Sequence, residues 1–140
     1  MGAFHLHIGA WRADRRGTAL IEFALVAPVF LAMLSGLAGY GGYFWRAHSL
    51  QQTANDAARA ALPGLTAPER EALARSAVTT DLAALGFDKN RTTTSVSESG
   101  ELVIVGIVYD GSRDAFLNLS MIPLPSKIIR RMAAVRLGGL

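Results

Sequence analysis

The sequence predicts an α+β fold with a long N-terminal helix, a second shorter helix and a small antiparallel sheet. An apolar run at residues 18–45 and helical spacing of apolar residues as far as residue 85 indicate the helices. From residue 91 onward, β-branched and aromatic residues take over and turn residues separate short apolar runs. Helices followed by strands along the chain are typical of an α+β domain.

The composition favours a membrane-associated chain over a small soluble domain. Of 140 residues, 51% are hydrophobic, and the mean hydropathy is +0.28. The net charge is +3, but lysine and arginine are scattered instead of forming one basic stripe, so we expect no nucleic-acid partner. The chain has no cysteine, which excludes a disulfide, a thiolate nucleophile and a cysteine metal site.

Residues 18–45 are predicted to form a transmembrane helix. Glu22 is their only charged residue, and as a helix they would reach roughly 40 Å, whereas a hydrocarbon core needs about 30 Å. A buried core helix would show a polar face, and a cleaved secretory signal would be shorter. Aromatic residues at the far end would form half of an interfacial belt. They are Tyr40, Tyr43, Phe44 and Trp45.

The cationic residues around this span predict its orientation. Arg12, Arg15 and Arg16 precede it, and Arg46 follows it closely. Because positive residues stay on the cytoplasmic side, the N-terminus is predicted to be cytoplasmic and the rest of the chain exported. The predicted parts are a cytoplasmic segment at 1–17, a transmembrane helix at 18–45 and an extracytoplasmic α+β domain at 46–140.

Small residues and one proline interrupt the apolar span. Small residues four apart flatten a helix face for close packing with a neighbouring helix, although glycine is also generally common in membrane helices. Pro28 removes one amide donor and clashes with the carbonyl of Ala24, so we expect a kink or a locally loosened turn. The candidate packing residues are Ala32, Ser35, Gly36, Ala38, Gly39 and Gly42.

The helix is predicted to continue beyond the membrane until Pro63 and Gly64 stop it. Its polar residues Ser49, Gln51, Gln52 and Asn55 are interpreted as a solvated or subunit-facing surface. A second helix is predicted to begin after Thr66 as N-cap, with Pro68 and Glu69 in its first turn. We expect Gly86 to be its C-cap.

The C-terminal half is predicted to form a hairpin and a final strand. TTTSVSES and ELVIVGIVYD are the hairpin strands, joined by Ser99 and Gly100, and KIIRRMAAVRL is the last strand. FLNLSMIPLP contains Pro123 and Pro125, so it is interpreted as a loop or an edge segment. Asp110 and Asp114 are interpreted as turn residues.

No residue pattern in the sequence predicts catalysis. We find no phosphate loop, no Ser/His/Asp set and no paired-carboxylate spacing. The expectation is therefore a non-enzymatic protein with no catalytic residues, no cofactor and no metal site.

Glu22 needs an explanation, because a carboxylate in an apolar helix costs several kcal/mol unless it is paired or reaches water. One explanation is that it reaches the cytoplasmic interface near Arg16. The other comes from its neighbours. RRGTALIEF resembles the processing site of type IV pilin-like proteins, in which glycine ends a basic leader and glutamate is the fifth mature residue.

The resemblance implies that a prepilin peptidase removes residues 1–17 as a leader by cutting between Gly17 and Thr18. The free amine of Thr18 would then meet the Glu22 carboxylate of another subunit, next to Phe23. Glu22 would thereby select the subunit register in an assembly.

Residues 15–62 closely resemble TadE-like proteins of the Tad, or Flp, pilus, with weaker similarity in IPLPSKIIRRMAAVRL. The resemblance implies a pilin-like fold and a minor pseudopilin in the bacterial inner membrane with a periplasmic domain, acting in pilus assembly, in priming or at the tip. Implied partners are a TadF-like minor pseudopilin, the major Flp pilin, the prepilin peptidase and the inner-membrane assembly platform. The alternative is an unprocessed single-pass protein whose exported domain is a scaffold or ligand-binding module of a secretion apparatus.

Overall fold

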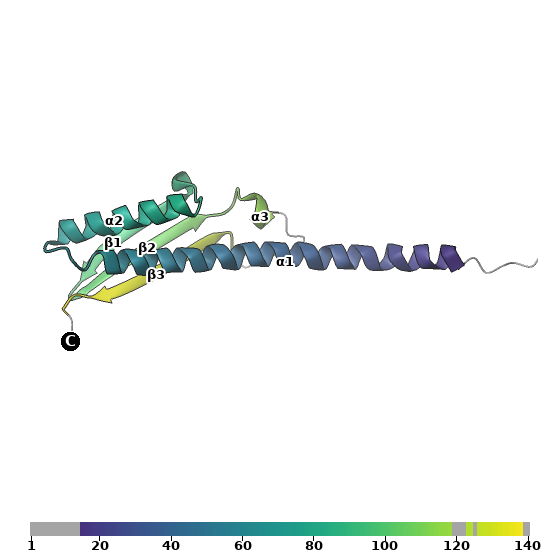
Figure 1. Ribbon diagram of the computed structural model, residues 1–140, viewed down its shortest axis with the longest axis horizontal. Helices are drawn as coiled ribbons and strands as arrows, with labels where there is room; N and C mark the ends of the chain where they lie inside the picture. Colours follow the sequence, from purple (N-terminus) through teal and green to yellow (C-terminus); the bar gives the residue numbers. More distant parts are fainter. Residues whose placement is uncertain (1–14, 119–122, 125, 139–140) are drawn as a thin grey trace, which may run out of the picture.

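The computed structural model describes residues 15–118, 123–124 and 126–138. One long helix, α1 (Arg15–Ala60), runs through the molecule, and the other elements gather around its C-terminal half (Figure 1). A second helix and a three-stranded antiparallel sheet complete the architecture. The predicted α+β, pilin-like fold is confirmed.

Helix α1 is continuous over 46 residues, which corresponds to roughly 70 Å. It passes through Pro28 without interruption (Figure 1), and the kink or locally loosened turn expected there stays a prediction. One missing amide donor removes a single hydrogen bond, and the helical bonds on either side keep the helix continuous. The helix ends at Ala60, just before Pro63 and Gly64, as the sequence predicts.

Helix α2 (Ala67–Ala84) begins as predicted. The Thr66 hydroxyl accepts a hydrogen bond from the Glu69 amide at 3.4 Å, and the Glu69 carboxylate accepts one from the Leu65 amide at 2.9 Å. At the other end Leu85 is the C-cap, and Gly86 follows it in the left-handed region at φ 73°. The predicted stop at Gly86 is therefore correct to within one residue.

The sheet contains β1 (Thr92–Ser99), β2 (Leu102–Asp110) and β3 (Ile128–Arg136), in the order β1-β2-β3. Both pairings are antiparallel. Because Ser99 pairs with Leu102, the hairpin turn consists of Gly100 and Glu101, one residue later than predicted. Gly100 has φ 60°, a conformation that glycine adopts without strain.

Two short helices occur in the connections. A 3-10 turn, η1 (Lys89–Arg91), leads into β1, and α3 (Ala115–Asn118) follows β2. The segment predicted as a loop or an edge strand therefore begins with one helical turn. The Asn118 amide donates to the carbonyls of Ser112 and Asp114, at 2.9 and 2.8 Å, and so closes that turn. Of the rest of that segment, the structure describes Pro123 and Leu124.

The core lies between one face of the sheet and both helices. Small alanine side chains on α1 let α2 and the sheet approach closely, while larger apolar residues fill the remaining space. The core residues are Ala47, Leu50, Ala54, Ala57, Ala58 and Ala61 of α1, Ala74, Val78 and Leu82 of α2, and Val103, Val105, Ile107, Tyr109, Ile129 and Ala133 of the sheet.

Candidate assembly sites on the long helix

The N-terminal part of α1 projects away from the folded body (Figure 1). Its large apolar side chains are exposed, from Leu20 through Phe23, at 71%, to Leu37, also at 71%. This is the one helix among the described residues that is long and apolar enough to cross a membrane. Residues 17–37 rise roughly 30 Å as an α-helix, which matches one hydrocarbon core.

The folded body begins to contact α1 before the predicted end of the membrane span at residue 45. The Tyr40 hydroxyl donates to the Pro123 carbonyl at 3.0 Å. Gly36 and Gly39 are buried within the chain. The last turns of the predicted span therefore belong to the packed part of the molecule, and the exposed apolar length is close to what a bilayer requires.

The predicted packing stripe of small residues is divided by the fold. Gly36 and Gly39 are buried by the chain itself, whereas Ala38 is exposed on another side of α1. The remaining members, Ala32, Ser35 and Gly42, are half-buried. Part of the stripe thus serves packing within this chain, and its use between subunits stays a prediction.

The predicted processing and assembly residues lie in the first two turns of α1. Gly17 is half-buried, and Thr18 and Glu22 are exposed. A Cβ atom added at Gly17 would meet nothing within 4 Å. Glu22 has no ion-pair or hydrogen-bond partner in the described part of the chain, and exposed Ile21 and Phe23 flank it. The geometry therefore presents a bare carboxylate on an apolar surface.

A polar and aromatic cluster joins α1 to the body just beyond the span. Arg46 Nε lies 2.7 Å from Asp114 Oδ2, and the Tyr109 hydroxyl donates to the same oxygen at 2.9 Å. Burial raises the pKa of Tyr109, and the hydrogen bond to Asp114 adds to this. Phe87 stacks on Trp45 with centroids 6.0 Å apart and meets the Tyr109 ring edge-on at 5.1 Å.

The interpretation of both aspartates as turn residues is correct for the backbone, because the Asp114 amide donates to the Gly111 carbonyl at 2.9 Å, but it missed the side-chain contact of Asp114. Asp110 does act in the turn, because it accepts from the Ser112 amide at 2.9 Å. Asp114 instead is buried against Arg46, which lies 68 positions earlier in the chain and gives no local sequence signal. The sequence signal that points to this pair is Arg46 itself, a cation beside an apolar span that requires a counter-ion.

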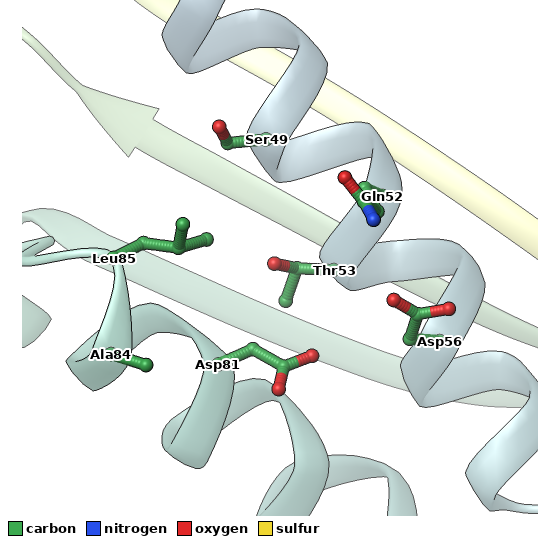
Figure 2. Close-up of a pocket in the computed structure, with 7 residues that line it drawn as sticks. All are labelled: Ser49, Gln52, Thr53, Asp56, Asp81, Ala84 and Leu85. Carbon is green, nitrogen blue, oxygen red and sulfur yellow. The ribbon is translucent and has the colours of Figure 1, made fainter.

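A second site is a cleft of about 250 Å³ between α1 and α2, which we call the α1–α2 cleft (Figure 2). Desolvation raises the pKa of Asp81, and repulsion from Asp56 raises it further. The polar residues of α1 that were predicted to form one surface point in different directions. Ser49 and Gln52 line the cleft, while Gln51 donates to the Met132 carbonyl at 2.9 Å. The lining residues are Ser49, Gln52, Thr53, Asp56, Asp81, Ala84 and Leu85.

Comparison with known protein families adds to this geometry. Residues 17–59 match the family model described as TadE-like protein. Over this segment the chain is similar to the TadE-like family. The matched residues cover nearly all of α1 and lie within the 15–62 stretch that resembles the family by sequence. No curated protein and no solved structure matches the chain.

The similarity over residues 17–59 is consistent with a TadE-like protein of the Tad pilus system. The match and the exposed apolar helix together fit a membrane-anchored, pilin-like protein. No group of three or more histidine or acidic side chains within the described ranges could hold a metal ion. The candidate functional features are the exposed apolar helix and the surfaces of the folded body.

Proposed function

We propose that this TadE-like chain is a non-catalytic minor pilin-like subunit that acts in assembly, in priming or at the tip of a Tad pilus. Its N-terminal helix would lie in the bacterial inner membrane, with the N-terminus cytoplasmic and the folded body periplasmic. The observation that carries the proposal is Glu22, an exposed carboxylate without a partner among the described residues, on a helix whose apolar side chains are also exposed.

The cost of that carboxylate supports an assembly role. An isolated charge in lipid costs several kcal/mol, and a cation within hydrogen-bond reach offsets this cost in a low dielectric. A neighbouring subunit would supply this cation as the α-amine of its own Thr18, after the prepilin peptidase has cut between Gly17 and Thr18. The exposed helix around Glu22 leaves the apolar surface that such a contact would bury.

Other pilin-like subunits are the partners that this contact requires. We propose a TadF-like minor pseudopilin and the major Flp pilin as neighbours, and the inner-membrane assembly platform as the site of contact. The exposed side of α1 at Ala38 is available for helix packing with them, because a small side chain lets another helix approach closely.

Co-purification of the full chain with these subunits from membranes tests the proposal. Glu22→Gln keeps the size of the side chain and removes its charge, so the variant should insert normally but lose its partners. Val26→Ala, one turn further along the same exposed helix, is the matched control and should retain them. Unchanged co-purification of Glu22→Gln, together with an intact leader by mass spectrometry, would favour the unprocessed single-pass alternative.

A further inference from the structure

The α1–α2 cleft concentrates oxygen atoms that have no partner among the residues that the structure describes. Side chains of Ser49 and Thr53 point from α1 toward α2, and that of Asp81 points back from α2 (Figure 2). Thr53 keeps 2% of its surface exposed and Ser49 7%, yet neither hydroxyl is hydrogen-bonded to another residue in the described chain. No fully enclosed side-chain polar atom in that part of the chain lacks a partner, so both hydroxyl oxygens open onto the cleft.

The two carboxylates in the cleft also lack a cation to balance their charge among the described residues. Asp56 and Asp81 face each other across the two helices closely enough to repel, and neither forms an ion pair within the described residues. A cation between them would relieve this repulsion and provide hydrogen-bond donors for oxygens that now have none. The Thr53 side chain, which is almost fully buried and whose hydroxyl opens onto the cleft without a partner among the described residues, is an observation independent of the two acids.

The size of the cleft and its apolar side limit which ligands can fit. A volume of about 250 Å³ far exceeds that of a bare metal ion. Ala84 and Leu85 form an apolar wall beside the polar residues. A ligand with a charged head group and a hydrocarbon stem matches a cleft with one polar and one apolar side. Long cationic side chains pack in this way, because they bury their stems and keep the charge near polar partners.

We propose that the α1–α2 cleft accepts an arginine side chain of a neighbouring subunit, with the guanidinium between Asp56 and Asp81 and the stem on Leu85. Arginine carries five donors in a planar fork and can therefore serve two carboxylates and a hydroxyl together. Calcium binds only oxygen ligands and would leave the apolar wall of Ala84 and Leu85 unused, whereas the stem of arginine covers it. The inference rests on the proposed function, because it requires a subunit packed against this chain.

A titration of the full chain in detergent micelles with n-butylguanidinium tests the cleft, with NMR of the Asp81 carboxyl and the Thr53 amide as readouts. We expect saturable shifts at both positions and a lowered pKa of Asp81. Guanidinium chloride, which lacks the stem, should bind more weakly. Equal shifts with both probes, or saturable shifts with calcium chloride and none with n-butylguanidinium, would overturn the proposal.

Two variants and one control locate the binding. Asp56→Asn and Asp81→Asn should each weaken n-butylguanidinium binding about tenfold, as expected for the loss of a charged hydrogen bond. Glu71→Gln removes a carboxylate from α2 that pairs with Arg75 outside the cleft, so it should bind like the unmodified chain. Equal weakening in all three variants would show a general charge effect and refute a specific site.

Crosslinking in cells identifies the source of the arginine. With p-benzoylphenylalanine in place of Gln52, an exposed lining residue that the proposed contact does not use, the expected product joins this chain to an arginine-containing peptide of a pilin-like subunit, and Asp56→Asn should reduce it. Absence of such a product would refute the subunit source. Glu22→Gln must leave n-butylguanidinium binding unchanged, so failure of the proposed membrane contact is distinguishable from failure of the cleft.

Discussion

Arg46 and Asp114 form an ion pair, with 2.7 Å between Nε and Oδ2, that ties the helix just above the predicted membrane span to the loop after β2. Their side chains are 15% and 7% exposed, so this contact is largely shielded from water. Tyr109 donates to the same carboxylate oxygen. The cluster fixes the folded body at one height along α1.

Asp114→Asn should destabilise the folded body by about 2–3 kcal/mol, because it leaves the Arg46 charge in a partly buried site without this counter-ion. Urea unfolding of the full chain in detergent micelles, followed by tryptophan fluorescence, measures the change. Asp110→Asn, at the exposed end of β2, is the control and should change stability much less. Equal losses in both variants would contradict a special role for Asp114.

Ala57→Leu should destabilise the protein by about 1–3 kcal/mol, because Ala57 is fully buried where α1 meets α2 and the sheet, and added carbons overpack that space. Ala72→Leu makes the same change on the exposed side of α2 and should alter stability by less than about 0.5 kcal/mol. The same urea experiment compares them. If Ala57→Leu unfolded at the wild-type urea concentration, close packing of the alanines would not limit the contact.

Acid should weaken the contact between α2 and β1. A hydrogen bond from Arg70, Nε to Oε1 at 2.8 Å, lowers the pKa of Glu98. A glutamate whose pKa is lowered in the folded state contributes its full stabilisation above the pKa of the unfolded state, about 4.3. This stabilisation is lost as the pH falls through the pKa of the folded state. Glu98→Gln should therefore reduce the loss of stability between about pH 7 and about pH 3.5. An unchanged acid dependence would show that other groups dominate.

Asp81→Asn should stabilise the isolated protein at neutral pH. Burial and Asp56 raise the pKa of Asp81, so the folded chain binds more protons than the unfolded chain above the ordinary aspartate value of about 3.9. Stability falls as the pH rises through that window, and the full cost is present at neutral pH. The gain should be about 0.5 kcal/mol, a typical size for partly exposed charges. A loss of stability in the variant would instead indicate a structural role for the Asp81 carboxylate.

Gly17→Leu should block removal of the leader without disturbing the helix, since an added Cβ at Gly17 meets nothing within 4 Å. Mass spectrometry of the N-terminus from membranes should show an intact chain, while the wild type begins at Thr18. Gly41→Leu, at another glycine of α1 with open space, is the control and should still be trimmed. Trimming of both variants would refute the predicted processing site.

The order and type of the main elements could be predicted from the sequence, because each carries a local signal. Thr66 and Gly86 mark the ends of α2, and Pro63 with Gly64 stops α1. The hairpin was misplaced by one residue because Ser99 and Gly100 resemble a turn as closely as Gly100 and Glu101 do. Only the register of the strands, set by the buried face of β2, distinguishes the two.

The sites that sequence reasoning missed depend on contacts between distant residues. Asp114 pairs with Arg46, 68 positions earlier in the sequence, and Asp81 faces Asp56 only because α2 folds back along α1. Gly36 and Gly39 carry a motif for packing with another helix, but the folded body covers them first. Glu22 could be singled out from sequence alone, because a lone charge in an apolar run is itself the signal.

The uninterrupted course of α1 has a mechanical consequence. A single rod extends from the lipid-facing end to the alanines beneath α2 and the sheet, with no hinge to absorb displacement. A force along the helix axis at Glu22 would thus be transmitted to the folded body through the Arg46–Asp114 ion pair and through the buried alanines of α1. Extraction from the bilayer would move the protein as one piece, while the sheet keeps its orientation to the shaft.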